Sequence, residues 1–475
     1  MASIKQRGNS WLVTISNGYD SSGKKLIKTK TFKKPHDMTD HKWEKELEKL
    51  ALEFELQVER GLHLDGGKLT FADFTEIWLR DYAERNLAPK TLARYKELLS
   101  TRIVPTIGHI RLEKLQPSHL LEFYDNLSED GIRLDDIFIA KPELNSIIEK
   151  ENVSIEALSI ASGISARTIG SMLNGHSVLR RSAIAINNSL NIILKRQLDL
   201  KKLFFLKGEP RGLSGRTILH HHRLISSMLT TGVHWQLVTN NVASRVKPPK
   251  TDRTQAEYYD ETETGRLLTL LEGAPLKYKV ALHIVIFGGL RLGEVSALTW
   301  DCIDFKNNFM QIRQSAQYIP GQGSFIKDTK NATSDRIISM PASVLELLKQ
   351  YKAWQSEEKL RIGDSWNKDW DNNKWIFTKW NGERVFHSTI SHWFRKFREG
   401  NELPKLSFHQ LRHTNASLLI GLGTNIQTVS KRLGHSRTST TTDIYAHALQ
   451  RPDREAADNL EGLFDKSKSN KVKQA

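Results

Sequence analysis

The sequence predicts a multidomain, mostly helical protein with a small α+β domain at its start and a small antiparallel sheet in its C-terminal half. The chain has 475 residues, which at about 150 residues per domain suggests about three domains. β-prone runs separated by turn residues occur near the start and again within residues 310–340. Most of the remaining chain places apolar residues at helical spacing.

The composition indicates a folded protein without membrane spans. Apolar residues make up 39% of the chain and charged residues 26%, which is typical of globular domains. No apolar run reaches the roughly 18 residues of a membrane helix, and residues 1–7 contain no apolar signal core. The single cysteine, Cys302, excludes an intramolecular disulfide and a Cys-rich zinc module. We therefore expect a cytoplasmic protein.

The charge balance favours a polyanionic partner. Lys and Arg total 70 against 54 Asp and Glu, which gives a net charge of +16 and a pI of about 9.6. Such an excess attracts polyanions and raises their rate of encounter. Nucleic acid is the favoured partner, although solubility alone could also explain a basic chain.

Residues 1–65 are expected to form the α+β domain. Residues 11–15 are β-prone, and turn residues follow at 17–18 and 20–23. We expect a second strand with lysines on one face, suited to contacting phosphates or to protecting a sheet edge; these lysines are Lys24, Lys25, Lys28, Lys30, Lys33 and Lys34. A charged helix is predicted over residues 39–61.

Two helical stretches, 66–130 and 210–250, flank a segment of different composition. In the first stretch, Lys90 and Arg94 lie on the polar side of a predicted helix and are candidate DNA contacts. Residues 131–209 are densely aliphatic and contain no Trp or Tyr. We expect this segment to be an all-α insert.

The insert contains a pattern similar to the helix-turn-helix of repressor-like proteins. Residues 154–165 predict a helix and a tight turn at Gly163, and residues 167–173 predict a second helix. A purely structural helical bundle is the alternative. The candidate groove-facing residues are Ser165, Arg167, Thr168 and Ser171, with Arg180 and Arg181 as candidate phosphate contacts.

Residues 251–465 predict a mostly helical domain that contains the second sheet, and 466–475 form a polar basic tail. A buried helix over 280–287 ends at two glycines. Residues 310–319 and 335–340 alternate as strands. Further helices are predicted at 344–357, 388–399, 409–420, 426–433 and 439–447.

Several catalytic patterns are absent from the sequence. No glycine-rich phosphate-binding loop is present, so ATP use is not indicated. The run from Asp364 to Trp375 lacks the glycine and the final Glu of a calcium loop. His220, His221 and His222 occupy consecutive helix positions and point in different directions, so they do not predict a metal site.

Basic and hydroxyl residues of the C-terminal half form a candidate site. Arg291 follows the buried helix with Glu294 one turn away, which is unfavourable unless the charge is paired or used. His409 and Arg412, spaced i and i+3, share a helix face. Each residue alone is more often structural, and Arg291 with Glu294 alone would be an ordinary ion pair. The candidate set in chain order is Arg291, Lys330, His409, Arg412, His435 and Tyr445.

The order and spacing of this set resemble the catalytic residues of the tyrosine recombinases, the phage integrase family. Three strings carry the resemblance: Gly-Leu-Arg-Leu-Gly-Glu at 289–294, Leu-Arg-His-Thr at 411–414, and Leu-Gly-His-Ser at 433–436 with Tyr445 ten positions after the histidine. The resemblance implies an arm-type DNA-binding domain at 1–65, a discontinuous core-binding domain at 66–130 and 210–250, and a catalytic domain at 251–465. The insert at 131–209 is foreign to the family pattern.

The resemblance also implies roles that suit the chemistry of a phosphodiester. Arg291 and Arg412 would donate to the non-bridging oxygens, and His409 and His435 would add hydrogen bonds. Tyr445 would attack as the nucleophile and form a 3′-phosphotyrosine. His409 would be the base and Lys330 the acid that protonates the leaving 5′ oxygen. Glu294 would orient Arg291, and neither a metal nor another cofactor is expected.

The expected function is integrase-type, conservative site-specific recombination that integrates and excises a mobile element such as a phage or integrative element. The expected partner is double-stranded DNA, at crossover sites and arm sites, bound by a homotetramer associated with the nucleoid. Directionality or bending factors are possible further partners, and a membrane is not. The alternatives are a non-catalytic DNA-binding regulator, a dimer-resolving recombinase, which would lack the arm domain, and a type IB topoisomerase.

Overall fold

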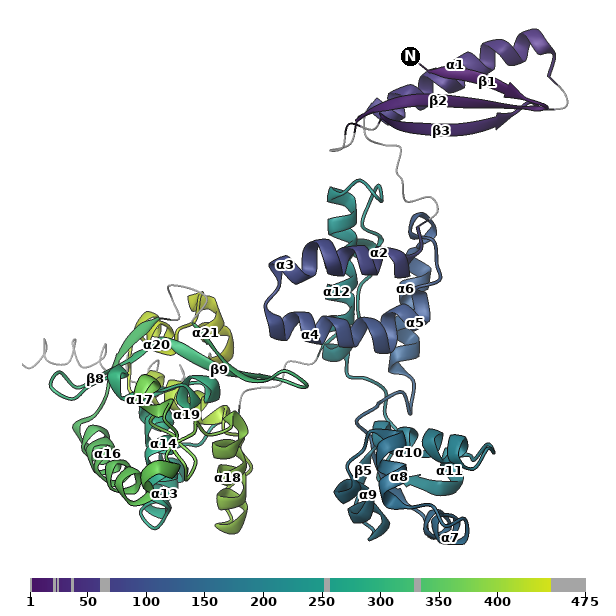
Figure 1. Cartoon of the computed structure of the whole chain (residues 1–475). Coiled ribbons are helices and arrows are strands. Elements are labelled where there is room, and N and C mark those ends of the chain that lie inside the picture. Colours follow the sequence, from purple (N-terminus) through teal and green to yellow (C-terminus); the bar gives the residue numbers. More distant parts are fainter. Residues whose placement is uncertain are drawn as a thin grey trace, which may run out of the picture. The chain divides into compact units, whose positions relative to one another are not determined.

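The computed structural model describes residues 2–19, 23, 25–35, 38–59, 69–251, 257–328 and 335–445. The chain divides into two compact units, residues 1–252 and 253–475. The described parts are mostly helical and contain four small antiparallel sheets (Figure 1). In these ranges, no helix has the length and apolar character that crossing a bilayer requires.

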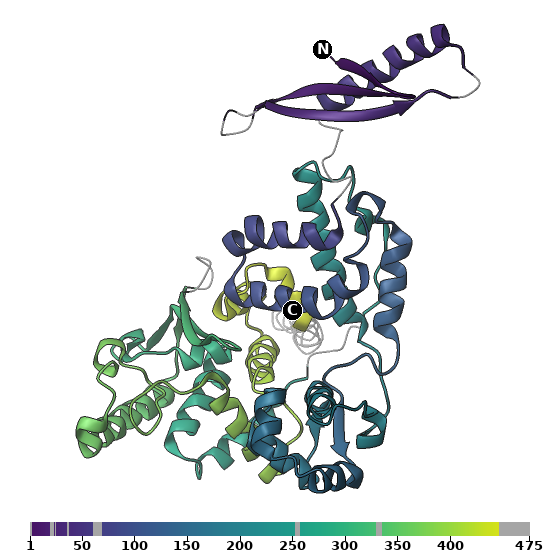
Figure 2. The same cartoon turned by 45° about the vertical axis from the view of Figure 1, so that its right-hand side comes forward.

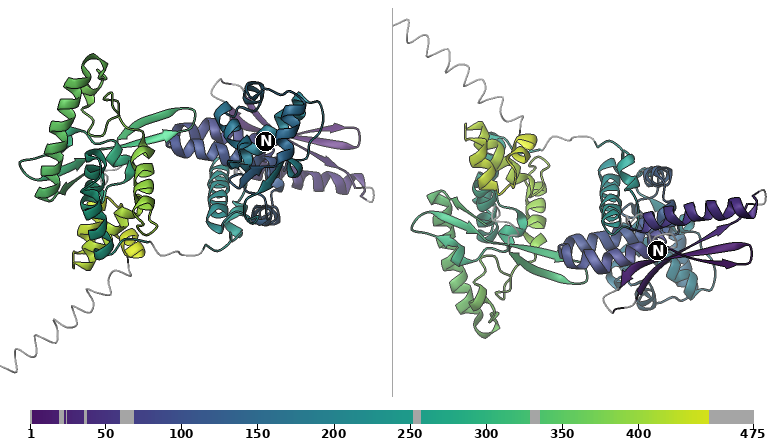
Figure 3. Two further views of the ribbon diagram at one scale, coloured as in Figure 1. Left: turned by 90° about the horizontal axis from the view of Figure 1, so that it is seen from below. Right: turned by 90° about the horizontal axis from the view of Figure 1, so that it is seen from above.

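The first element group is a three-stranded sheet covered on one face by a helix. Strands β1 (Ser3–Arg7), β2 (Ser10–Tyr19) and β3 (Lys25–Lys33) pair antiparallel in the order β1-β2-β3. Helix α1 (Asp40–Glu59) lies along one face of this sheet, as Figure 3 shows from two directions. Val13, Ile15 and Phe54 are buried between them, because alternate strand residues point to the same face.

The lysines of β3 do not share one face, which corrects the expectation from the sequence. Lys28 is buried, and Lys30 lies over the rings of Phe32 and Phe54. These two lysines therefore occupy the face covered by α1. Lys25 and Lys33 lie on the open face, because their positions have the opposite parity along the strand.

The second group is helical and is assembled from two separate stretches of the chain. Its helices are α2 (Phe71–Trp78), α3 (Glu84–Asn86), α4 (Pro89–Leu98), α5 (Val104–Ile107), α6 (Pro117–Ser128) and α12 (Gly215–His234), with π-helical turns at Leu79–Ala83 and Leu99–Ile103. Both stretches contribute to one hydrophobic core. Trp78 in α2 donates from Nε1 to Thr231 Oγ1 in α12 at 3.2 Å.

The segment between these stretches has a hydrophobic core of its own. It comprises α7 (Pro142–Lys150), α8 (Ile155–Ser162), α9 (Ala166–Leu173), α10 (Arg180–Ile193) and α11 (Leu200–Leu203). It also contains a sheet in the order β5-β4-β6, made of β4 (Ile137–Ala140), β5 (Val178–Leu179) and β6 (Phe204–Leu206). Figure 2 shows these elements from another side.

The expectation of an all-α insert is therefore wrong. The three strands are two to four residues long, so each is too short to show a period of two in the sequence. Phe138 and Phe204 point into the core, while the backbone groups of these apolar runs are satisfied by pairing between strands. The sheet forms from chain segments that are far apart in the sequence.

The second unit is built around the buried helix α14 (Leu276–Gly288). Its other helices are α13 (Glu261–Leu271), α15 (Leu292–Ser296), α16 (Ala342–Ile362), α17 (Trp370–Asn373), α18 (His387–Gly400), α19 (Gln410–Gly421), α20 (Ile426–Leu433) and α21 (Thr438–Tyr445). Val280, Ile284 and Val285 of α14 are fully buried, and α14 contacts α16, α18 and α19.

Two small sheets accompany these helices. One has the order β11-β8-β7, from β7 (Ile303–Asp304), β8 (Phe309–Ile312) and β11 (Arg336–Ser339). The other is the hairpin of β9 (Gln314–Ile319) and β10 (Gly323–Asp328). The single strand expected over 310–319 is thus divided at Arg313 between two sheets.

Candidate active site

Two glycines position Arg291 at the start of α15. Gly289 ends α14 in the left-handed conformation with φ +68. A Cβ at this position would lie 2.6 Å from Asn415 Oδ1 and 2.8 Å from Leu433 Cδ2. A Cβ on Gly293 would lie 2.5 Å from Ser315 Oγ. Both positions therefore require glycine. This requirement explains the two glycines of the sequence Gly-Leu-Arg-Leu-Gly-Glu at 289–294.

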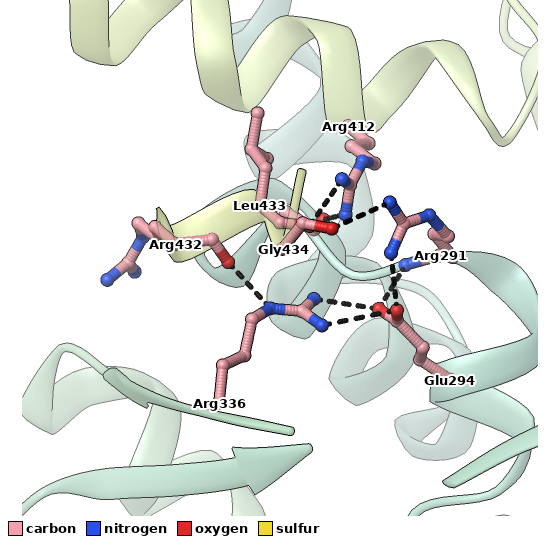
Figure 4. Close-up of polar contacts among 8 residues, drawn as sticks. Arg291, Glu294, Arg336, Arg412, Arg432, Leu433 and Gly434 are labelled. Atoms are coloured by element: carbon pink, nitrogen blue, oxygen red, sulfur yellow. Dashed lines mark hydrogen bonds and ion pairs between the residues drawn. The ribbon is translucent and has the colours of Figure 1, made fainter. Parts of the chain in front are cut away.

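The carboxylate of Glu294 is buried, 3% exposed, and binds two arginines. Oε1 accepts from Arg291 Nη1 at 2.8 Å, and Oε2 accepts from the Arg291 backbone N–H at 2.9 Å (Figure 4). Arg336 donates from Nη1 to Oε1 at 3.2 Å and from Nη2 to Oε2 at 2.8 Å. Burial alone would raise the pKa of Glu294, but the bond and charge of Arg336 and the charge of Arg291 lower it to about 2.

Arg412 connects the turn before Arg291 to the end of α20. It is 2% exposed and donates from Nη1 to the Gly289 carbonyl oxygen at 2.7 Å. Its Nη2 donates to the carbonyl oxygen of Leu433, and Arg291 Nη2 donates to that of Gly434 at 3.3 Å. Figure 4 shows the guanidinium groups of Arg291 and Arg412 on the same side of the turn at Leu433 and Gly434.

His435 follows directly after this turn. Gly434 ends α20 in the left-handed conformation with φ +66, and His435 Nδ1 is 2.9 Å from the hydroxyl of the buried Thr441. Partial burial and the charges of Arg412 and Arg291 lower the pKa of His435 to about 4. The imidazole of the free protein is therefore neutral near pH 7.

His409 lies at the start of α19, before Arg412. Desolvation, followed by the charges of Arg412 and Arg291, lowers its pKa, and its ring centroid is 5.3 Å from that of His413. Desolvation and the neighbouring His409 and Arg412 lower the pKa of His413 to about 4. A neutral imidazole can accept a proton, as the expected base must.

The structure thus brings Arg291, Glu294, Arg412 and His435 together around two turns, with His409 within electrostatic range of both arginines. Tyr445 is the last residue of α21, which packs against α20, and its side chain is not described. Lys330 and Lys24 lie outside the described residues. Within the described ranges, no group of three or more His, Cys, Asp or Glu side chains is placed to hold a metal ion.

Arg336 is a member of this cluster that the sequence reasoning missed. It is the first residue of β11 and is 8% exposed, and its Nε donates to the Arg432 carbonyl oxygen at 2.7 Å. In β11 the buried positions are Arg336 and Ile338, whereas Ile337 is 60% exposed. One feature of the sequence indicates this role: the alternation of the predicted strand places Arg336 on the same, inward-facing side as Ile338.

The expected DNA-contacting side chains lie in three other regions. Lys25 and Lys33 are exposed, whereas Lys34 forms an ion pair with Asp40. Lys90 and Arg94 are exposed on α4, and Arg94 Nη1 is 2.7 Å from Glu97 Oε2.

In the insert, a short turn at Gly163 joins α8 to α9. Gly163 ends α8 with φ 67 in the left-handed conformation, and the Ser165 hydroxyl accepts the backbone N–H of Thr168 at 3.2 Å at the start of α9. Arg167 and Thr168 are exposed on α9, whereas Ser171 is half-buried. Arg180 and Arg181 begin α10; Arg180 lies over the ring of Phe138 and Arg181 is exposed.

Comparison with known proteins gives the class of protein: an enzyme of the tyrosine recombinase type, which cleaves and rejoins DNA. The phage integrase family matches residues 257–451, and the N-terminal SAM-like domain of phage integrases matches residues 70–128. The chain belongs to the phage integrase family of tyrosine recombinases.

Relatives of known type agree with this membership, and a solved structure shares the fold. The chain is 27% identical over 292 residues to a tyrosine recombinase XerC-like protein of Caldanaerobacter subterraneus, covering 58% of this chain and 73% of the relative. It is 27% identical over 254 residues to the ICEBs1 integrase of Bacillus subtilis, covering 53% and 67%. The Tn1549 transposon integrase, solved with circular intermediate DNA, matches the fold with a TM-score of 0.54 and 16% identity, over 83% of this chain and 100% of that one.

Proposed function

We propose that this recombinase integrates and excises a mobile element by cutting and rejoining DNA at specific sites through a 3′-phosphotyrosine on Tyr445. The observation that carries the proposal is the anchoring of Arg291 and Arg412 on the adjoining turns at Gly289 and Leu433–Gly434. Donors fixed in advance lose little freedom when they bind a phosphoryl group, so they stabilise the charge that develops on it.

Each residue of the candidate set is assigned one role in this reaction. Arg291 and Arg412 donate to the non-bridging oxygens, and His435 adds a further hydrogen bond. His409, neutral in the free protein, accepts the Tyr445 phenolic proton, and Lys330 protonates the departing 5′ oxygen. The phosphotyrosine retains the energy of the broken bond, so rejoining uses no ATP.

The domain layout is part of the proposal. Residues 1–65 serve as an arm-type DNA-binding domain, 66–130 with 210–250 as the core-binding domain, 131–209 as an inserted DNA-reading module, and 251–465 as the catalytic domain. Separate hydrophobic cores in the first three regions support this division, as does the SAM-like match over 70–128.

Two surfaces outside the catalytic domain are proposed to contact DNA. On the arm sheet, the open face offers Lys5, Arg7, Thr29, Thr31 and Lys33, all exposed; basic and hydroxyl side chains of this kind suit phosphates and base edges. In the insert, Arg167, Thr168 and Ser171 of α9 would face a groove.

The partner is double-stranded DNA, on which four protomers assemble at two crossover sites, with accessory bending or directionality factors as possible additions. A protein with this partner would be found at the nucleoid. The positive net charge of +16 supports DNA association.

An in vitro recombination assay tests the proposal. A supercoiled plasmid carrying the end sequence of the element and a duplex carrying its target sequence are incubated with the purified chain, and the products are analysed on native and denaturing gels. We expect reciprocal recombinants without ATP. Relaxation of supercoils without recombinants would indicate a topoisomerase, and DNA retention without any cleavage would indicate a regulator.

A further inference from the structure

The geometry points to Arg336 as a positioning residue for strand cleavage, one that offsets the charge of Glu294, so that the positive charge of Arg291 is available to DNA, and that fixes the turn preceding His435. This inference rests on the proposed function, because it assigns a role in DNA cleavage to a buried residue that contacts Glu294. The two carboxylate oxygens of Glu294 accept four hydrogen bonds, two from Arg291 and two from Arg336.

The charge of this cluster explains why a second arginine is present. Glu294 orients Arg291, but the negative charge of its carboxylate also cancels the positive charge of Arg291. That positive charge would otherwise attract a DNA phosphate. With Arg336 included, the three ionised groups together carry one net positive charge. Arg336 has a side chain 6% exposed, whereas that of Arg291 is 37% exposed. The uncancelled charge is therefore available to a ligand at Arg291.

Arg336 also supports the turn that precedes His435. Its Nε donates to the Arg432 carbonyl oxygen at 2.7 Å, and a Cβ on Gly434 would lie 3.0 Å from its Nη1. The Gly434 carbonyl oxygen in turn accepts from Arg291 Nη2. One buried guanidinium thus holds both the carboxylate that orients Arg291 and the backbone that carries His435.

Three variants separate the charge contribution from simple stabilisation. Arg336→Met removes the charge and all the bonds, and Arg336→Lys keeps the charge but loses the planar fork. The double variant Glu294→Gln with Arg336→Met removes both buried charges, so Arg291 regains an uncancelled charge and no unpaired carboxylate is left in the core. Arg398→Met is the matched control. Arg398 is also 8% exposed, but its Nη1 donates to the carbonyl oxygen of Leu406 at 2.7 Å and not to Glu294.

The readout compares single-turnover cleavage of two crossover duplexes carrying the element's end sequence. One has the natural scissile phosphodiester, and the other has a neutral methylphosphonate there. Losing a positive charge from the site slows reaction of the charged phosphate more than that of the neutral one. A defect caused only by unfolding slows both equally.

We expect Arg336→Met to reduce cleavage of the phosphodiester at least about tenfold more than cleavage of the methylphosphonate. Arg336→Lys and the double variant should return this ratio toward that of the unaltered chain, and Arg398→Met should leave the ratio unchanged. An unchanged ratio in Arg336→Met, or an equal shift in the double variant, would overturn the inference. If Arg336→Met does not fold, the ratios of the other two variants decide. Absence of cleavage by the unaltered chain would instead count against the proposed function.

Discussion

Arg412 donates a hydrogen bond to the carbonyl oxygen of Gly289 across 123 positions of the chain. The same guanidinium holds Leu433, so it joins the turn before Arg291 to the turn before His435. One side chain is therefore a candidate phosphate ligand and also fixes the position of two others.

Arg412→Lys tests whether strand cleavage requires the several N–H donors of the Arg412 guanidinium. Lysine keeps the charge but presents a single ammonium, which cannot hold both carbonyl oxygens and still meet a phosphate. We expect strand cleavage to fall by about 10²–10³-fold, with DNA affinity retained, in single-turnover and gel-shift assays. The same exchange at the exposed Arg395 of α18 is the control. Unchanged cleavage in Arg412→Lys would show that charge alone suffices.

Gly289→Ala should destabilise the catalytic unit by about 1–3 kcal/mol. The added Cβ meets Asn415, whose Nδ2 is bonded to the Ile286 carbonyl oxygen at 2.8 Å and so resists displacement. The positive φ adds strain. Denaturant unfolding measures the change in the free energy of unfolding.

Gly265→Ala provides the matched comparison, because Gly265 lies within α13 with open space around its Cβ position. This exchange should be neutral or should stabilise by up to about 1 kcal/mol. Equal effects of the two exchanges would contradict the account of the Gly289 turn.

The catalytic unit should lose stability as the pH falls from about 6.5 to 4. His413 and His435 have pKa values lowered to about 4, whereas an unfolded histidine titrates near 6.5. Between these values the unfolded chain binds protons that the folded chain does not, so acid favours unfolding. Glu294, with its pKa lowered to about 2, adds a further loss only below about 4.5.

Calorimetric melting at several pH values measures this effect. His413→Gln and His435→Gln should each flatten the dependence of Tm on pH between 6.5 and 4, whereas His392→Gln, at an exposed position of α18, should leave it unchanged. If neither His413→Gln nor His435→Gln alters the dependence of Tm on pH, these two histidines are not the source of the acid sensitivity.

Replacing residues 132–208 by a short Gly/Ser linker should preserve folding and cleavage of a bare crossover site. The two ends of the insert leave the helical core side by side: Leu213 donates its backbone N–H to the Leu127 carbonyl oxygen at 2.9 Å, and a Cβ on Gly212 would lie 1.9 Å from the Ser128 carbonyl oxygen. A short linker can therefore close the gap.

What should change on this deletion is targeting or regulation, through loss of Arg167, Thr168 and Ser171. Gel shifts on longer element-end duplexes and cleavage assays on the bare site separate the two effects. An unfolded or inactive deletion protein would show that the insert belongs to the helical core. A fully active and unchanged protein would leave the insert without the proposed DNA-binding role.

Much of the fold and of the candidate site could be predicted because the relevant signals are local. The apolar run 280–287 and the glycines that follow it predict α14 and its end, and the i, i+3 spacing of His409 and Arg412 predicts their common location. The strings at 289–294 and 433–436 identify the residues at both turns.

The remainder depends on contacts between distant segments. The β5-β4-β6 sheet joins residues 137, 178 and 204, each in a run too short to indicate a strand. Arg336 is 42 positions from Glu294, so their pairing carries no local pattern. The division of the β3 lysines between two faces depends on which face α1 covers.

Covalent capture of DNA tests the central claim most directly. The unaltered chain and Tyr445→Phe are incubated with duplexes carrying the element's end sequences, in the presence of EDTA, and analysed on denaturing gels. We predict a protein–DNA adduct with the unaltered chain and none with Tyr445→Phe, although both bind the duplex equally, because only the attacking oxygen is lost. An adduct that persists in Tyr445→Phe would contradict the assignment of Tyr445 as the nucleophile.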